Sequence, residues 1–337
     1  MTAMNQQILL ASRPSGFPTE SDFRLVETAT PSPGPGEFSA RVIYLSVDPY
    51  MRGRMSPARS YAAPVEIGQV MVGGAIGQVV ESTHPQFRPG EFVVGMFGWQ
   101  QYAVSDGKGV RKVDPGVAPL SVWLGVLGIT GLTAYFGLLD ICDPKPGETV
   151  VVSGAAGAVG SIVGQIARIK GCRVVGIAGA DAKVEWLLDE LGFDAAFNYK
   201  TVTNYYAMLL ELCPRGIDVY FDNVGGALTD AVLRLITVHA RISICGQISQ
   251  YNLEKPEMHP RWLSLLIVKR AKVQGFLITD YWPRFDQGIR ELGQWLKEGK
   301  LQHREQFVDG IENAPAAFLG MLRGDNTGKQ LVKISEP

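Results

Sequence analysis

The sequence predicts an α/β protein with two domains, one a doubly wound parallel sheet and the other a smaller all-β domain. Two patterns carry this prediction. Between residues 148 and 278, apolar strands alternate with helical stretches, which is typical of a parallel sheet with right-handed helical crossovers. Before residue 115, short apolar runs recur about every ten residues between Gly and Pro turns, as in a small barrel or sandwich. The length of 337 residues also fits two domains.

The all-β domain is expected to use both ends of the chain. Its first strands follow Pro-Gly turns, and the C-terminal run GKQLVKI is again a short apolar strand. Helices are expected before this strand, at about 286–298 and at 312–324. The expected strands are 35–47, 73–82, 87–104 and 328–334. We expect one domain to span 1–125 and 305–337, and the other to span 126–304.

In the alternating region, strands are short apolar runs, whereas helices repeat an apolar residue every three or four positions. The helix at 182–192 ends at a glycine, a common stop signal. The expected strands are 148–152, 173–177, 195–198, 217–226, 240–247 and 272–278. The expected helices are 161–171, 182–192, 201–213, 227–239 and 261–271.

The stretch 115–139 contains no charged residue and is long enough to cross a membrane. However, it holds five glycines and two prolines and has no basic flank to anchor it. We therefore expect a buried helix here and no membrane partner.

Charge and cysteine content exclude several classes of protein. With 32 basic and 33 acidic residues, the chain has no positive excess for binding nucleic acid or an anionic membrane. The four cysteines are widely spaced and form no CxxC pair, which argues against a disulfide framework and against structural zinc. The first residues, MTAMNQQILLASR, lack the pattern of a secretory signal. Together these features predict a cytoplasmic protein.

The strongest local motif is the glycine-rich turn in ETVVVSGAAGAVGSIVGQIA (148–167). Because a buried strand precedes it and a helix follows, the G-x-G-x-x-G dinucleotide fingerprint maps onto Ala155, Gly157 and Gly160, with alanine in the first position. Gly157 is expected to let the backbone approach a pyrophosphate, and Gly160 to let the helix pack on the strand. The helix amides and dipole favour an anion there. The motif predicts a Rossmann domain that binds a dinucleotide.

The residue at the position that usually binds the cofactor ribose is not acidic in this sequence. NAD sites usually carry Asp or Glu about 20 residues beyond the loop, at the end of the second strand. Here Ala178 or Gly179 occupies that position, and Lys183 follows within one helical turn. A cation facing a 2′-phosphate is favourable, although Asp181 argues mildly the other way. We therefore predict NADP(H) rather than NAD(H).

Motifs spread over nearly the whole chain resemble the medium-chain dehydrogenase/reductase superfamily. They are SVDPYMRGRM (46–55), SGAAGAVGS (153–161), VYFDNVGG (219–226), ARISICGQISQYN (240–252) and ENAPAAFLGMLRGDNTGKQLVKI (312–334). The chain is most similar to the zinc-independent branch of prostaglandin reductases and alkenal double-bond reductases, which includes curcumin-reductase-like proteins. This resemblance implies a GroES-like β-barrel catalytic domain built from both chain ends, beside a Rossmann domain. No cysteine precedes Cys142, and EIGQVMVGG stands where a zinc-binding histidine would lie, so we expect no metal.

The resemblance also implies which residues contact NADP(H). Asn223 and Cys245 follow the fourth and fifth strands, at the carboxyl edge where such sheets bind ligands. Phe276 and Leu277, on the sixth strand, are expected to bring their backbone near the nicotinamide. The other expected contacts are Ala156, Gly157, Ala158, Val159, Gly179, Lys183, Tyr199, Ser249, Tyr251 and Asn326.

A zinc-free site of this kind favours reduction of an electron-poor C=C bond. Hydride from NADPH would reach the β-carbon of a hydrophobic enone or enal, hydroxyl donors would stabilise the enolate, and the α-carbon would take a proton. Tyr50, Tyr61 and Tyr281 are the candidate donors, although each could instead pack with its hydroxyl in water. Tyr50 and Tyr61 match substrate-lining tyrosines of the resembling proteins.

Two other functions fit the same motifs. A quinone reductase of the related zeta-crystallin branch would share the fold and NADPH, and a non-catalytic NADPH-binding protein would share both without turnover. The apolar run KVQGFLI (272–278) at the sheet edge predicts a homodimer formed by edge pairing, because an uncovered apolar edge invites aggregation.

Overall fold

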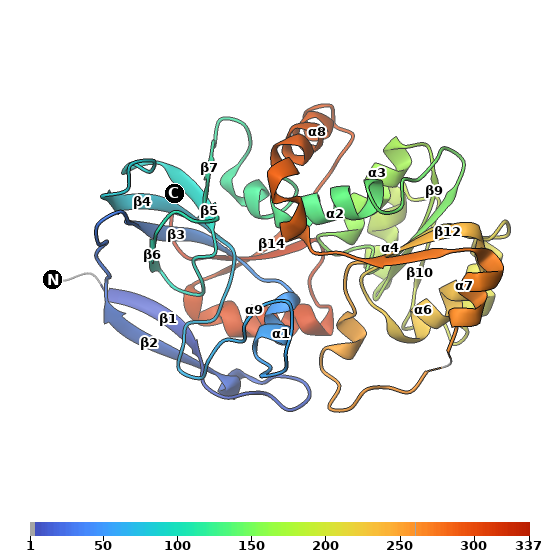
Figure 1. The fold of residues 1–337 in the computed structure, drawn as a ribbon, viewed down its shortest axis with the longest axis horizontal. Coiled ribbons are helices and arrows are strands. Elements are labelled where there is room, and N and C mark those ends of the chain that lie inside the picture. The colour runs from blue at the N-terminus through green and yellow to red at the C-terminus, as the bar shows by residue number, and fades with distance from the viewer. Residues whose placement is uncertain (1–3, 260) are drawn as a thin grey trace. The chain divides into compact units, whose positions relative to one another are not determined.

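The structure, a computed structural model, describes residues 4–259 and 261–337. The chain forms two compact units, and many of their helices and strands are labelled in Figure 1. Unit 1 contains the residues up to Leu124 together with Glu305–Pro337, and unit 2 contains Gly125–Arg304.

Unit 1 is built mainly of antiparallel strands. Its strands are β1 (Met4–Leu10), β2 (Phe23–Ala29), β3 (Phe38–Ser46), β4 (Ala75–Ser82), β5 (Phe92–Gly95), β6 (Tyr102–Ser105), β7 (Arg111–Val113), β14 (Glu305–Asp309) and β15 (Lys329–Lys333). β1 pairs with β2, and the larger sheet has the order β14-β15-β3-β4-β5-β7, with β6 on β3. The C-terminal strand β15 thus completes a sheet begun by the N-terminal part of the chain.

One aromatic cluster holds the core of unit 1. The Phe23 ring stacks on Trp99 at 5.6 Å between centroids, and Phe318 meets Trp99 edge-on at 5.8 Å. Met51 of helix α1 (Tyr50–Arg54) is fully buried in the same core, with Tyr50 packed at its margin. The remaining helices of unit 1 are η1 (Glu20–Asp22), η2 (Leu120–Leu124), η6 (Ile311–Asn313) and α9 (Ala314–Arg323). The core therefore anchors the short helix that carries a candidate tyrosine.

Unit 2 contains a parallel sheet. Its strands are β8 (Thr149–Ser153), β9 (Arg173–Ala178), β10 (Ala195–Asn198), β11 (Ile217–Asp222), β12 (Ile236–Ile244) and β13 (Lys272–Gly275). They lie in the order β10-β9-β8-β11-β12-β13, and every neighbouring pair is parallel. Numbered along the chain, this is the order 3-2-1-4-5-6, which reverses direction between β8 and β11.

Helices cover both faces of this sheet. Helices α2, α3 and α8 lie on one side, and α5, α6 and α7 pack their apolar side chains on the other (Figure 1). The helices of unit 2 are α2 (Ile129–Leu139), α3 (Gly160–Ile169), α4 (Asp181–Glu185), η3 (Trp186–Glu190), α5 (Tyr205–Leu212), α6 (Gly226–Leu233), η4 (Ile248–Gln250), α7 (Leu263–Lys269), η5 (Ile278–Arg284) and α8 (Phe285–Lys297). The sheet is thus doubly wound.

Three elements of unit 2 differ from the sequence expectation. The single helix expected at 182–192 is α4 followed by a π-helical turn. Strand β12 starts at Ile236, inside the expected helix 227–239, because the consecutive β-branched residues 236–238 favour extended backbone. The sixth strand ends at Gly275, so Phe276 and Leu277 follow the strand instead of lying on it.

The uncharged stretch 115–139 forms the short helix η2 and the mostly buried helix α2. Gly131 allows α2 to pack tightly against the preceding turn, because a Cβ at that position would lie 1.8 Å from the carbonyl oxygen of Val126. Within the described residues, no helix combines the length and apolar character needed to cross a bilayer.

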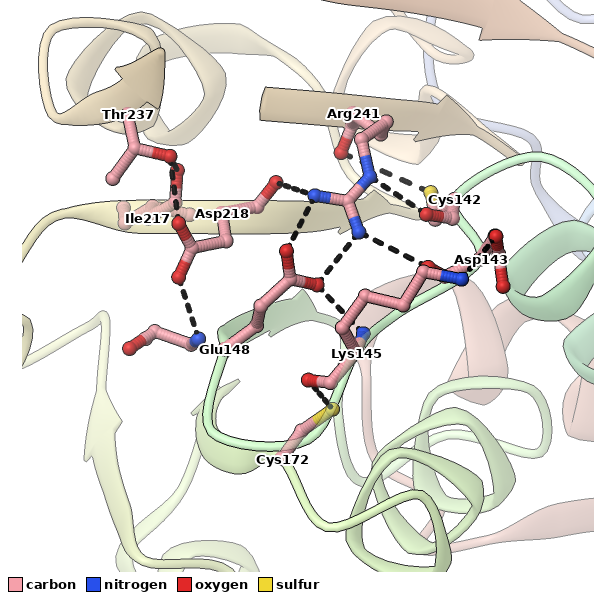
Figure 2. Close-up of polar contacts among 10 residues, drawn as sticks. Cys142, Asp143, Lys145, Glu148, Cys172, Ile217, Asp218, Thr237 and Arg241 are labelled. Carbon is pink, nitrogen blue, oxygen red and sulfur yellow. Dashed lines mark hydrogen bonds and ion pairs between the residues drawn. The ribbon is translucent and has the colours of Figure 1, made fainter. Parts of the chain in front are cut away.

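An ion pair ties together the amino ends of the central strands (Figure 2). The Arg241 guanidinium donates to both carboxylate oxygens of Glu148, at 2.9 and 2.6 Å, and also to the carbonyl oxygen of Cys142 at 2.7 Å. Asp218 accepts from the Thr149 amide at 2.8 Å. Burial raises the pKa of Glu148, but hydrogen bonds from Arg241 and the Lys145 amide outweigh it, so the pKa lies below its ordinary value. These contacts join β8, β11, β12 and the segment after α2.

We predict that Glu148→Gln lowers the free energy of unfolding at pH 7 by about 1–3 kcal/mol, because Arg241 loses a charged acceptor. The folded pKa of Glu148 is depressed, so its contribution is present above the unfolded pKa of about 4.3 and is lost as pH falls through the folded pKa. The difference between parent and variant should therefore shrink in acid. Urea unfolding across pH measures it.

Lys145→Gln is the matched control, since the Lys145 side chain pairs with Asp143 at the surface beside the same network. It should change stability by no more than about 0.5 kcal/mol. A parent–variant difference for Glu148→Gln that stays constant down to pH 3 would contradict the assignment.

Candidate active site

The glycine-rich turn joins β8 to α3, as the fingerprint predicts. Gly154 adopts φ +59°, a left-handed conformation that favours glycine. The turn therefore uses Gly154, one residue before the position that the fingerprint assigned to Ala155. Ala155 is buried, and its amide donates to Ile177 of β9 at 2.9 Å. Because of this shift, alanine is tolerated at the first fingerprint position.

The two later fingerprint glycines have different surroundings. A Cβ on Gly160 would lie 2.3 Å from the Gly154 carbonyl oxygen, so glycine is required for α3 to approach the turn. A Cβ on Gly157 would meet only the Gly154 oxygen, at 3.3 Å. The Ser161 and Ile162 amides already donate to the carbonyl oxygens of Gly157 and Val159. The expected contacts Ala156, Ala158 and Val159 lie just before them, at the amino end of α3, where the helix dipole favours an anion. The donor set fits a pyrophosphate.

The ends of β9 and β10 bring together two residues of the expected ribose region. A Cβ on Gly179 would lie 2.8 Å from the Tyr199 ring, so glycine leaves room for that ring. Asp181 accepts a hydrogen bond from the Asn198 side chain at 2.8 Å. Asp181 is the carboxylate whose charge would disfavour a 2′-phosphate, and in the structure it is hydrogen-bonded to Asn198. Lys183 lies in α4, just beyond Gly179.

The ends of β8, β11 and β12 meet where the strand order reverses. The Asn223 side chain donates to the Ser153 carbonyl oxygen at 2.7 Å, and the Asn223 amide donates to the Ser153 hydroxyl at 2.9 Å. The Cys245 amide donates to the backbone oxygen of Asp222 at 2.9 Å. Burial raises the pKa of the Cys245 thiol to about 12, which leaves it neutral.

The segment after β12 folds back over this edge. The Ser249 hydroxyl donates to the Val224 carbonyl oxygen at 2.7 Å. The Tyr251 hydroxyl accepts from the Gln247 amide at 3.2 Å. Ser249 and Tyr251 therefore lie on the same edge of the sheet as Asn223 and Cys245.

Three further residues, Ser153, Asp222 and Gln247, are hydrogen-bonded at this edge and were not expected there from the sequence. Their signal is present in the sequence, since each falls at the carboxyl end of a strand or just beyond it. Polar residues that directly follow parallel strands are therefore candidate ligand contacts in such a sequence.

Tyr281, Phe276 and Leu277 lie beyond β13. The Tyr281 ring stacks on Phe136 at 4.6 Å between centroids and meets Phe276 edge-on at 6.4 Å. Arg284 lies over both the Phe136 and Tyr281 rings. Burial raises the pKa of Tyr281. Leu277 is exposed. These contacts give the Tyr281 ring a packing role against α2.

Tyr50 and Tyr61 both belong to unit 1. Tyr50 begins α1, and burial raises the pKa of its hydroxyl well above the ordinary value. Tyr61 has a side chain that is 62% exposed. Arg54 joins the two segments, because its guanidinium donates to the Ala63 carbonyl oxygen at 2.6 Å and its own carbonyl oxygen accepts from the Val65 amide at 2.8 Å. The positive charge of Arg54 acts on both hydroxyls and opposes the rise in their pKa values.

A largely buried ion pair involves Asp48, two residues before Tyr50. The Lys329 ammonium donates to Asp48 at 3.1 Å and to the carbonyl oxygens of Val47 and Gln330, both at 3.0 Å. It thereby ties β15 to the turn that starts α1. Asn326, in the turn before β15, donates to the Gly328 carbonyl oxygen at 2.9 Å.

The structure thus gathers the expected cofactor residues of unit 2 along one sheet edge. Three of the expected residues, Tyr50, Tyr61 and Asn326, belong instead to unit 1. Within residues 4–259 and 261–337, no three His, Cys, Asp or Glu side chains are grouped so that they could hold a metal ion.

A glycine-rich turn between a parallel strand and a helix, beside a reversal of strand order, defines a dinucleotide-binding domain of the oxidoreductase type. Two family models match the chain. Residues 6–113 match the N-terminal domain of oxidoreductase, and residues 158–294 match a model described as zinc-binding dehydrogenase.

Comparisons with known proteins agree along the whole length. The chain is 47% identical to the NADPH-dependent curcumin reductase of Escherichia coli, over 98% of this chain and 97% of that one. It is 41% identical to the 2-alkenal reductase (NADP⁺-dependent) of Nicotiana tabacum, over 98% of each chain. The crystal structure of CurA in complex with NADPH from Vibrio vulnificus superposes with a TM-score of 0.94, at 48% identity, over 98% of this chain and 100% of that one.

The chain belongs to the medium-chain dehydrogenase/reductase family. The predicted fold class is confirmed, with a Rossmann-type parallel sheet and an N-terminal catalytic domain of the GroES-like kind.

We predict that Lys183→Ala raises the Kd for NADPH about tenfold or more, because the 2′-phosphate loses a charge-assisted hydrogen bond. The Kd for NADH, which lacks this phosphate, should not change. Fluorescence titration of both cofactors without substrate measures the two constants. Lys145→Ala, at the opposite edge of the same sheet, is the control and should change neither. If the ratio of the NADH Kd to the NADPH Kd is the same in the parent and in Lys183→Ala, another group binds the 2′-phosphate.

Proposed function

We propose that the protein reduces the C=C bond of α,β-unsaturated ketones and aldehydes with NADPH. The observation that carries this proposal is the Gly154–Gly160 turn at the reversal of strand order, in a chain similar throughout to reductases named for curcumin and 2-alkenals. The substrate class is small and hydrophobic. On this proposal, unit 2 is the NADP(H)-binding domain and unit 1 is the catalytic domain.

The residues that would hold NADP(H) are those gathered at the carboxyl edge of unit 2. The loop amides fit the pyrophosphate, and Gly179, Lys183 and Tyr199 fit the phosphorylated ribose. We propose the same contact role for Asn223, Cys245, Ser249, Tyr251, Phe276, Leu277 and, from unit 1, Asn326. When bound, NADPH supplies a hydride to the β-carbon of the substrate.

The tyrosines of unit 1 would stabilise the negative charge that develops on the substrate oxygen. A hydroxyl can do this only while it keeps its proton. Burial raises the pKa of Tyr50, so this hydroxyl remains a donor throughout the physiological range. Arg54, which acts on both Tyr50 and Tyr61, adds a positive charge that favours an oxyanion nearby. Tyr281 remains a third candidate, and its ring stacks on Phe136 of α2.

We predict that the parent oxidises NADPH with trans-enones and 2-alkenals faster than with benzoquinones. Tyr50→Phe should lower kcat for enones by about 100-fold, the usual effect of removing one hydrogen-bond donor to a developing oxyanion, while leaving the Kd for NADPH unchanged. Absorbance of NADPH follows both reactions. Tyr135→Phe is the control, because the Tyr135 hydroxyl is bonded to Glu291 within unit 2.

If the protein reduces quinones faster than enones, the proposed function is wrong and the protein is a quinone reductase. Binding of NADPH without turnover of any alkene would identify a non-catalytic protein. An unchanged kcat in Tyr50→Phe would remove Tyr50 from the mechanism.

We also infer that the protein is a homodimer and that it works in the cytoplasm. Strand β13 ends the strand order of the parallel sheet, and its Val273 is exposed. Next to it, Leu263, Ile267 and Val268 of α7 are also exposed, and Ile267 reaches 79%. A cavity of about 320 Å³ lies among α6, α7 and β12. Pairing of two β13 edges would cover this apolar surface.

We predict that light scattering gives about twice the chain mass at micromolar concentration, because the apolar edge is covered by a second copy. Ile267→Asp should shift the protein toward monomer, since a charge would be buried there. Leu210→Asp, at another exposed apolar position of unit 2, is the control and should leave the mass unchanged. A monomeric parent would contradict the dimer.

A further inference from the structure

Asp222 is a buried carboxylate in the middle of the carboxyl edge of unit 2. It is the last residue of β11, and its side chain has no solvent exposure. Among the described residues, six donors reach it. Oδ1 accepts from the Ser153 and Tyr220 hydroxyls and from the Val224 and Gly225 amides, and Oδ2 accepts from the Thr229 hydroxyl and the Gln247 side-chain amide. The distances are 2.9, 2.9, 3.0, 2.9, 2.6 and 2.9 Å in that order.

These donors come from every segment that meets at the strand reversal. Ser153 ends β8 and opens the glycine-rich turn, Thr229 lies in α6, and Gln247 follows β12. The Ser153 hydroxyl that donates to Asp222 also accepts the Asn223 amide. The Gln247 side chain that donates to Asp222 belongs to the segment that leads to Ser249 and Tyr251. The carboxylate thus fixes the backbone at the carboxyl ends of β8, β11 and β12.

The local backbone is shaped for these bonds. Gly225 has φ +76°, and a Cβ there would lie 2.1 Å from the Gln247 side-chain oxygen. A side chain at 225 would therefore displace Gln247 from Asp222. An unpaired buried charge is costly, so the turns can relax little without losing bonds to the carboxylate.

We propose that Asp222 is a positioning residue for NADPH binding. Its hydrogen bonds fix the conformation of the three turns, after β8, β11 and β12, that carry the expected cofactor contacts. This inference rests on the proposed cofactor but not on the proposed substrate. Asp222 acts through Ser153, Asn223 and Gln247.

Asp218 offers a matched control on the same strand. It lies near the amino end of β11, where its carboxylate accepts from the Thr149 amide at 2.8 Å and the Thr237 hydroxyl at 2.7 Å (Figure 2). The two aspartates are the same residue type on one strand, but only Asp222 lies at the proposed cofactor edge. Both should contribute to stability, and only Asp222 should contribute to cofactor binding.

The experiment compares Asp222→Asn with Asp218→Asn. In Asp222→Asn, an amide group that cannot accept replaces one oxygen, so some of the six donors lose their acceptor. The Kd for NADPH, from fluorescence titration without substrate, should rise about tenfold in Asp222→Asn and stay within twofold in Asp218→Asn. The Kd for NADH should rise by the same factor, because both cofactors share the contacts that Asp222 positions. Lower Tm is expected for both variants.

A second pair of variants tests the inference if Asp222→Asn does not fold. Thr229→Val removes one donor to Asp222 and keeps the carboxylate, whereas Thr229→Ser keeps the donor. Thr229→Val should raise the Kd for NADPH severalfold, and Thr229→Ser should restore the parent value.

An NADPH Kd in Asp222→Asn within twofold of the parent, or no larger than that of Asp218→Asn, overturns the inference. So does a parent that binds no NADPH. A parent that binds NADPH but does not reduce enones refutes only the proposed reaction, because the binding measurement uses no substrate.

Discussion

The reversal of strand order between β8 and β11 is the constraint on which the rest of this structure depends. On each side of that point, the crossover helices leave in opposite directions along the sheet, so the loops after β8 and β11 separate at the carboxyl edge. In sheets of this kind, ligands generally bind at this place. What the sequence adds is a turn with glycine at 154 and 160, which lets the amino end of α3 pack closely against the end of β8.

The two edges of the parallel sheet are stabilised by different kinds of polar contact. At the amino edge, Arg241 and Glu148 form a bidentate pair that joins strands, so the positive charge of Arg241 is already paired with a carboxylate. At the carboxyl edge, the donors to Asp222 among the described residues are all neutral, so hydrogen bonds stabilise this carboxylate in place of an ion pair. The same strand, β11, carries both kinds of aspartate.

The sequence predicted the alternation, the glycine-rich turn and the edge position of the sixth strand, because each is a local pattern of apolar and glycine residues. It did not predict that Gly154 makes the turn in place of Ala155, since the φ angle depends on how β9 receives the Ala155 amide. It also passed over Asp222 and the Lys329–Asp48 pair. Lys329 and Asp48 are 281 residues apart. The donors Ser153 and Gln247 lie 69 and 25 residues from Asp222. One polar residue after an apolar strand also gives no periodic signal.

Hydrogen–deuterium exchange with and without NADPH, in the absence of substrate, tests most directly that the cofactor binds at the strand reversal. Bound NADPH should slow exchange at the amides of 154–161 and of 222–226, because those groups gain acceptors or become less accessible. Slower exchange confined to other segments of the chain, or no change at any amide under saturating NADPH, would contradict the account.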